Sequence, residues 1–172
     1  MKRPIRIDGD VAYVTLTKGY VAVIDAADVP LVDGFNWCAE VNARPDGTIK
    51  AVYARRKDYS GLKGKTIHMH RLIAGTPDGL ETDHEDGNGL NNRKTNLRSA
   101  TKAQNGRNRG KNANNTSGFK GVSFRKDIGK WMSKIAVDRK QRFLGFFRCP
   151  TAAHFAYVRA SADVHGEYGR FD

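Results

Sequence analysis

Short hydrophobic runs separated by glycine and aspartate fill the first part of the chain. Such runs, with β-branched and aromatic residues, predict strands, and they cover residues 11–16, 20–24 and 50–55. Residues 26–33 have the composition of one or two helical turns, and Phe35 and Trp37 are candidates to pack the strands together. We therefore expect a β-rich N-terminal module over residues 1–66.

The same pattern returns near the C-terminus. It predicts three strands, at residues 120–125, 130–138 and 141–147, followed by a helix over residues 151–165 that Gly166 ends. Residues 118–172 should thus form a three-stranded antiparallel sheet packed on one helix. Alternation in the second strand divides its side chains between two faces, Trp131, Ser133 and Ile135 on one and Met132, Lys134 and Ala136 on the other. The first face should pack on Phe155, Ala156 and Ala162 of the helix, with Lys134 exposed.

The middle of the chain is polar and carries the candidate chemistry. Asp83 and His84 precede a loop rich in glycine and asparagine, a short strand follows at residues 97–100, and Thr101 fits the N-cap of a helix that carries Asn105. This order can bring Asp83 and His84 opposite Asn105. Residues 110–117 lie in a stretch without large apolar side chains and are expected to be a basic linker. The fold class expected for the chain is α+β.

Charge is concentrated in one part of the chain. Of the net charge of +12, residues 93–148 contribute +14, because they contain sixteen Lys or Arg and only Asp127 and Asp138, which leaves −2 elsewhere. A basic segment of this length attracts phosphate backbones and fits a nucleic acid better than a small acidic substrate. A solvated charged face is the alternative explanation.

Two other classes of protein are disfavoured. Cys38 and Cys149 are far apart, so neither a disulfide framework nor a cysteine zinc site is expected. No segment approaches the roughly 20 apolar residues that a membrane span needs, and the N-terminus begins with charged residues. We expect a cytoplasmic protein without a membrane partner.

Asp83, Asn105 and His84 are residue types suited to metal-assisted hydrolysis. Carboxylate and amide oxygens are ligands for a hard divalent ion, and histidine is a base that is largely neutral near pH 7. Asp and Asn also cap local turns without any function. His68 and His70, two residues apart, have the spacing to direct both rings to one metal, although packing or a DNA contact explains them as well.

The motifs in this region resemble those of HNH homing endonucleases, which contain a ββα-metal finger. The resemblance spans residues 67–109 and rests on Met69-His70-Arg71-Leu72, Asp83-His84, Asp86-Gly87-Asn88, Asn91-Asn92-Arg93, Asn96-Leu97-Arg98 and Gln104-Asn105. It implies that Asp83 and Asn105 bind one divalent metal ion, Mg²⁺ or Mn²⁺, that His84 is the general base, and that Asn96 orients His84. The cysteine-bound zinc of some relatives is absent, so no structural zinc is expected.

Residues 116–172 resemble the plant ethylene-response-factor type of DNA-binding domain. The similar motifs are Ser117-Gly118-Phe119-Lys120-Gly121-Val122, Gly129-Lys130-Trp131, Leu144-Gly145-Phe146-Phe147 and the alanine-rich helix. The resemblance implies DNA contacts from the sheet through Arg125, Lys130, Lys134, Gln141, Arg142 and Phe143. Further phosphate contacts are expected from Arg93, Arg98, Arg107, Arg109, Lys111 and Lys120. Ser123, Ala136 and Ile128 depart from the plant pattern, so the plant target sequence does not transfer.

These observations together predict a metal-dependent endonuclease that cuts double-stranded DNA, and the resemblance implies that it acts as a monomer. Its C-terminal sheet would select the site, and the resemblance implies an origin in a phage or another mobile element. Two alternatives remain open. One is a DNA-binding regulatory protein with an inactive finger, and the other is an RNA-binding or structural protein, because basic charge alone does not distinguish DNA from RNA.

Overall fold

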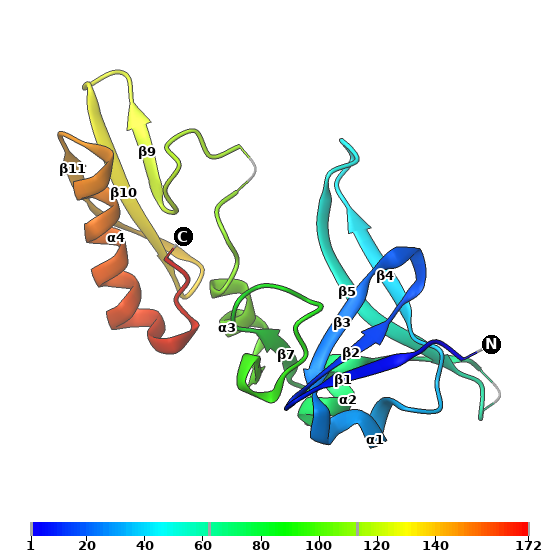
Figure 1. The fold of residues 1–172 in the computed structure, drawn as a ribbon. Coiled ribbons are helices and arrows are strands. Elements are labelled where there is room, and N and C mark those ends of the chain that lie inside the picture. The colour runs from blue at the N-terminus through cyan, green and yellow to red at the C-terminus, as the bar shows by residue number, and fades with distance from the viewer. Residues whose placement is uncertain (1, 62, 113, 172) are drawn as a thin grey trace. The chain divides into compact units, whose positions relative to one another are not determined.

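The computed structural model describes residues 2–61, 63–112 and 114–171. The chain forms two compact units, unit 1 (Met1–Lys102) and unit 2 (Ala103–Asp172). Both combine small antiparallel sheets with few helices, which confirms the α+β class (Figure 1). No helix in the described residues is long and apolar enough to cross a membrane.

Unit 1 contains three small sheets. The first has the order β1-β2-β3, with β1 at Ile5–Asp8, β2 at Val11–Thr15 and β3 at Val21–Asp25. The second has the order β4-β5-β6, with β4 at Cys38–Ala43, β5 at Ile49–Asp58 and β6 at Lys65–His68. The third pairs β7 (Glu81–His84) with β8 (Leu97–Ala100). All pairings within the sheets are antiparallel.

Short helices connect these sheets. The α-helices are α1 (Val29–Val32), α2 (Met69–Ala74) and α3 (Lys102–Arg107), and 3₁₀ turns occupy Thr17–Gly19, Ala26–Asp28 and Lys94–Asn96. Helix α2 ends at Gly75, whose φ of 57° is left-handed and therefore suits glycine. The strands β7 and β8 with α3 give the strand, loop, strand and helix order that the sequence predicts.

One hydrophobic core runs through unit 1. Most of its buried members come from β2, β3, β4, β5 and α2, and they include Ala12, Val14, Ile24, Val52, Ala54, Met69 and Ile73; Trp37, just before β4, joins them. Trp37 is 1% exposed, and its indole Nε1 donates to the Val32 carbonyl at 2.9 Å. Met69 and Ile73 belong to the same core as the N-terminal strands, so this core crosses the predicted module boundary between residues 66 and 67.

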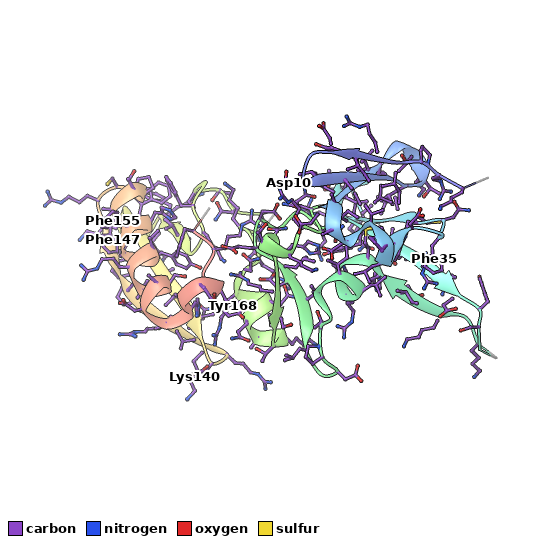
Figure 2. All side chains as sticks on the ribbon, turned by 60° about the horizontal axis from the view of Figure 1, so that its bottom comes forward. Asp10, Phe35, Lys140, Phe147, Phe155 and Tyr168 are labelled. Carbon is purple, nitrogen blue, oxygen red and sulfur yellow. The ribbon has the colours of Figure 1, made fainter. Side chains whose placement is uncertain are left out.

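The predicted N-terminal strands are confirmed with small changes at their ends, whereas β1 and β4 were not predicted. The helical turns expected at residues 26–33 are also present. Trp37 packs the strands as expected, but Phe35 is 43% exposed and lies beneath the Arg56 guanidinium, 3.9 Å from its ring centroid (Figure 2). An aromatic side chain at a surface turn can bind a cation instead of the core.

Unit 2 contains the three-stranded sheet and the helix expected from the sequence. The sheet has the order β11-β10-β9, with β9 at Val122–Arg125, β10 at Lys130–Val137 and β11 at Lys140–Phe147. Helix α4 (Pro150–His165) lies along β10 and is followed by a 3₁₀ turn at Gly166–Tyr168 (Figure 1).

The helix face that packs on this sheet differs from the predicted one. Ala153, Tyr157, Ser161 and His165, spaced by four, form the buried stripe of α4, because the Tyr157 ring lies over Gly121, which has no side chain in the way. Phe155 is two positions out of phase with this stripe and is 68% exposed (Figure 2). The expectation that Phe155 and Ala162 pack on Trp131 and Ile135 was therefore wrong.

Candidate active site

Asp83 and His84 end strand β7 and are both buried, with 3% and 6% of their surface exposed. In the antiparallel pair, Asp83 lies opposite Arg98 and His84 opposite Leu97. The Arg98 Nε donates to Asp83 Oδ2 at 2.8 Å, and the Arg98 side chain is only 14% exposed. Strand pairing and this ion pair hold the carboxylate. Arg98 is therefore better placed to fix Asp83 than to bind DNA as the sequence predicted.

Aromatic side chains surround the His84 ring. His70 meets it edge to face with 5.1 Å between centroids, and Tyr53 lies at 5.9 Å. His68 stacks on the other side of His70 at 5.3 Å, and the Nε2 of His68 lies 3.1 Å from Glu40 Oε2. Burial lowers the pKa of His84, against smaller raising effects of its neighbours. Burial and the nearby histidines lower the pKa of His70 to about 3. Both rings are thus neutral near pH 7.

One ring nitrogen of His84 is hydrogen bonded to an asparagine that the sequence reasoning did not select. His84 Nε2 and Asn92 Oδ1 are 3.2 Å apart, and Asn92 has no exposed surface. The residue is visible in the sequence as part of the Asn91-Asn92-Arg93 motif. Nothing in that motif shows which of its side chains turns inward, and neighbouring asparagines in a loop favour turn formation equally well.

Asn96 makes different contacts from those expected. Its Nδ2 donates to Asp86 Oδ1 at 3.0 Å and to the Asn91 carbonyl at 2.8 Å, and its Oδ1 accepts from the Asp86 backbone N–H at 3.0 Å. Glu85 N also donates to the Asn96 carbonyl at 2.9 Å. Asn96 thus holds the loop that follows His84, and the side-chain hydrogen bond to the ring comes from Asn92 instead.

Strand β3 anchors the far end of this loop. Val23 N donates to the Leu90 carbonyl at 2.9 Å, and Asn92 N donates to the Val23 carbonyl at 2.7 Å. These two bonds make an isolated parallel bridge between Val23 and Asn91. A segment near the N-terminus therefore orders the loop beside His84, which gives residues 1–66 a structural role that the sequence left open.

Arg93 and Lys94 follow this loop and bind carboxylates of the N-terminal sheet region. Arg93 Nε lies 2.7 Å from Asp25 Oδ1, and Arg93 Nη2 lies 2.7 Å from Asp10 Oδ2. Lys94 Nζ pairs with the buried Asp28 at 2.5 Å, and Lys94 N donates to Asp25 Oδ2 at 2.8 Å. The Arg93 guanidinium thus joins the loop to the N-terminal sheet region, and its contact with DNA stays a prediction.

Asn105, the second predicted metal ligand, lies half-buried on α3 and belongs to unit 2, whereas Asp83 belongs to unit 1. A carboxylate and an amide oxygen are the donor types that Mg²⁺ and Mn²⁺ take, so the chemistry of this pair fits such an ion. Within the described residues, no group of three or more His, Cys, Asp or Glu side chains is arranged to hold a metal.

Several predicted DNA-binding residues of unit 2 make intramolecular contacts. Arg125 forms two hydrogen bonds to Asp127, at 2.9 and 2.6 Å, and Arg107 lies 3.8 Å from Asp138. Lys120 Nζ donates to the Arg107 carbonyl, and Lys111 Nζ donates to the Gly118 carbonyl. Other predicted side chains are exposed on the sheet or in the linker, namely Arg109, Lys130, Gln141, Arg142 and Phe143, while Lys134 is half-buried.

Phe143 has an exposed aromatic partner, Phe146, which strict alternation of side chains along the strand would not predict. Phe143 and Phe146 are 52% and 44% exposed, and their rings meet edge to face at 4.9 Å. In a regular strand, residues three apart point to opposite faces. Here the register shifts, with Ser133 opposite Gly145 and Lys134 opposite Phe143, so a bulge turns both rings to one face.

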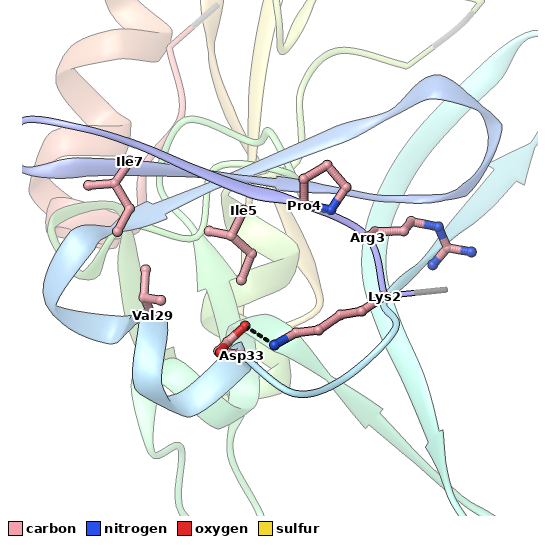
Figure 3. Close-up of a pocket in the computed structure, with 7 residues that line it drawn as sticks. All are labelled: Lys2, Arg3, Pro4, Ile5, Ile7, Val29 and Asp33. Atoms are coloured by element: carbon pink, nitrogen blue, oxygen red, sulfur yellow. Dashed lines mark ion pairs between the residues drawn. The ribbon is translucent and has the colours of Figure 1, made fainter.

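A hollow in unit 1 lies between the first residues of the chain and α1 (Figure 3). A Lys2–Asp33 ion pair of 2.6 Å crosses it, and Ile5 and Val29 supply apolar walls. It contains none of the predicted site residues. The candidate site is therefore defined by the β7–β8 finger and its loop.

Together these features describe a β7–β8 hairpin with a buried Asp-His pair, followed along the chain by the short helix α3. The chain belongs to the HNH endonuclease family, since residues 67–107 match the family model described as HNH endonuclease and a related phage protein matches over most of its length. That relative is Protein 3.8 of Escherichia phage T7, which is 34% identical over 95 residues, 55% of this chain and 78% of the phage protein.

A second relative is the DNA endonuclease I-HmuI of Bacillus phage SP01, 48% identical over 54 residues, which are 28% of this chain and 31% of I-HmuI. A solved structure on DNA binding and cleavage by the HNH homing endonuclease I-HmuI aligns at 33% identity over 56% of this chain and 50% of that chain, with a TM-score of 0.30. The matched part of I-HmuI is less than two thirds of that protein.

Proposed function

We propose that this chain is a metal-dependent DNA endonuclease in which His84 takes a proton from the water that attacks a phosphodiester. The observation that carries the proposal is the buried Asp83-His84 pair on a family-matching ββα finger, with the histidine ring held by a hydrogen bond and its pKa lowered by burial. A neutral ring at pH 7 is the form that accepts a proton.

Asp83 and Asn105 would hold one divalent ion, either Mg²⁺ or Mn²⁺. When bound, such an ion supplies Lewis-acid stabilisation of the charge that grows on the phosphate and the leaving oxygen. Arg98 orients the Asp83 carboxylate through its 2.8 Å contact. Asn96 keeps the loop that follows His84 closed on Asp86.

The sheet of unit 2 is proposed to hold and select double-stranded DNA. Its support is the exposed face that combines the Phe143–Phe146 pair with the side chains of Lys130 and Gln141. The proposed DNA-contacting side chains on the sheet also include Arg125, Lys134 and Arg142. Those toward the linker are Arg107, Arg109, Lys111 and Lys120. Phosphate contacts give affinity, and contacts to base edges give selectivity. We propose a monomer of phage or mobile-element type.

Supercoiled plasmid provides the direct test. Purified protein with Mg²⁺ or Mn²⁺ should convert it to nicked or linear DNA, and EDTA should stop the reaction. His84→Ala should lower the cleavage rate by about 10²- to 10⁴-fold, the usual contribution of a general base, with unchanged DNA affinity. Thr95→Ala, at an exposed position after the same loop, controls for nonspecific damage to this region. Cleavage by His84→Ala at the wild-type rate would refute the role of His84.

The alternative is a regulatory protein that binds DNA without cutting it. Its support is that the exposed aromatic and basic sheet of unit 2 needs no catalytic finger to bind DNA. Tight, saturable binding to a short duplex, with no metal-dependent product from that duplex, would favour it. Competition by structured RNA at equal mass would instead favour an RNA ligand.

A further inference from the structure

Asn92 is among the largest side chains in unit 1 with no exposed surface. Burying an amide is unfavourable unless its donors and acceptors are satisfied. The contacts of Asn92 reach three separate elements, because its backbone N–H binds Val23 of β3 and its side chain approaches Met69 of α2 and His84 of β7. A residue that only terminates a turn needs none of these long-range partners.

The neighbours of Asn92 determine which way its amide points. Its Nδ2 lies 3.2 Å from the Leu90 carbonyl oxygen and 3.8 Å from the Met69 sulfur. Both of these atoms are acceptors without a hydrogen, so the NH₂ group must face them. The reversed amide would place its oxygen against a carbonyl oxygen. The Asn92 Oδ1 therefore faces His84 Nε2, at 3.2 Å.

This orientation determines where the proton of the neutral His84 ring lies. An amide oxygen only accepts hydrogen bonds, so Nε2 must be the donor. A neutral imidazole carries one N–H, and the lone pair must then lie on Nδ1. Nδ1 is thus the nitrogen able to take a proton from water.

We propose that Asn92 is the positioning residue of His84, which fixes the ring as the Nε2–H tautomer and thereby makes Nδ1 the basic atom of the site. The catalytic part of this inference rests on the proposed nuclease function, whereas the tautomer does not. The role differs from that of Asn96, whose amide is engaged with Asp86 and Asn91.

Strand β3 holds Asn92 in place. The Val23 carbonyl accepts from Asn92 N at 2.7 Å, and the Leu90 carbonyl accepts both from Val23 N and from the Asn92 amide. Val23 thus holds the backbone of Asn92, and Leu90, which is itself bonded to Val23, holds its side chain. The N-terminal sheet is thus linked to His84 through Asn92.

The first test observes the ring itself, without metal or DNA. Long-range ¹H–¹⁵N NMR of histidine-labelled, full-length protein at neutral pH reports which nitrogen carries the proton, and His84→Ala assigns the signals. Wild-type His84 should be the Nε2–H tautomer. Asn92→Leu should shift the ring toward a mixture of tautomers, whereas Thr95→Ala, which changes an exposed side chain in the same region, should match wild type. A wild-type ring protonated on Nδ1, or an unchanged tautomer in a folded Asn92→Leu, overturns the inference.

The second test measures single-turnover cleavage and DNA affinity separately. Asn92→Leu should lower the cleavage rate about 10- to 100-fold, as removal of an orienting partner does, with unchanged Kd for DNA. Wild-type rates in folded Asn92→Leu overturn the inference and leave the nuclease assignment intact. A chain that never cuts DNA refutes the nuclease assignment, and the NMR result still decides the tautomer.

Discussion

His70 should make unit 1 sensitive to acid. Its ring lies between His68 and His84, Arg71 is the next residue, and its Nδ1 is buried without a hydrogen-bond partner among the described residues. Burial first, then the charges of these neighbours, lower its pKa from 6.5 to about 3. The folded state therefore keeps the ring neutral at pH values where the unfolded chain protonates it.

The sign and size of the effect follow from this difference in pKa. Between pH 6.5 and about 3 the unfolded state binds more protons, so the free energy of unfolding falls as the pH falls. At pH 5 the unfolded histidine favours its protonated form about 30-fold, which corresponds to about 2 kcal/mol lost relative to pH 8. His70→Phe keeps an aromatic ring and removes this proton, so it should lose about 2 kcal/mol less over the same interval.

Urea unfolding followed by tryptophan fluorescence tests this value. The chain has two tryptophans, and in a Trp131→Phe background the signal comes from Trp37 in the core of unit 1. His154→Phe changes a histidine of unit 2 and should leave the pH dependence of unit 1 unaltered. Equal losses of unfolding free energy in wild type and His70→Phe between pH 8 and pH 5, within about 0.5 kcal/mol of measurement error, would refute this role of His70.

Three further changes test packing and pairing. Lys94→Met should destabilise unit 1 by about 1–3 kcal/mol, because it leaves the buried Asp28 carboxylate without its cation. Adding Asp28→Asn to the same chain should recover part of this loss, as measured by urea unfolding. Gly121→Ala should lower the Tm of unit 2, since its Cβ would meet the Tyr157 ring and the backbone φ is 74°; an unchanged Tm contradicts that contact. Phe155→Lys should change stability by less than about 0.5 kcal/mol, as expected for an exposed side chain, and a larger loss would restore the packing first predicted from the sequence.

Local patterns in the sequence predicted most of the elements of the fold. Hydrophobic runs bounded by glycine located β2, β3, β5 and the sheet of unit 2, because strand signals extend over only a few neighbouring residues. The order of β7, β8 and α3 was also predicted. Errors arose where phase matters. Phe155 was placed wrongly because it depends on which helix stripe is buried. The Phe143–Phe146 pair, which was not predicted, depends on one bulge, and neither feature is encoded in a simple period.

The contacts around the site were less predictable because they join distant parts of the chain. Arg93 is separated from Asp25 by 68 positions and from Asp10 by 83. In the sequence alone, Arg93 therefore looks like one more cation of a basic segment. Asn92 and Asn96 both occur in the recognised motifs, and only the fold shows that the former turns toward His84 and the latter toward Asp86.

The polar loop after His84 explains why the N-terminal sheet is needed beside the site. Its glycines and asparagines favour many backbone conformations, and ordering each residue costs about 1–2 kcal/mol. A loop of this composition buries little apolar surface, so it depends on hydrogen bonds and ion pairs from outside. Asn96 closes one end on Asp86, and β3 fixes the other through Val23, Asn92 and the carboxylate that binds Arg93. The position of the His84 ring is therefore a property of the whole of unit 1, and truncation of the N-terminal strands should release the ring even though they supply none of the predicted catalytic groups.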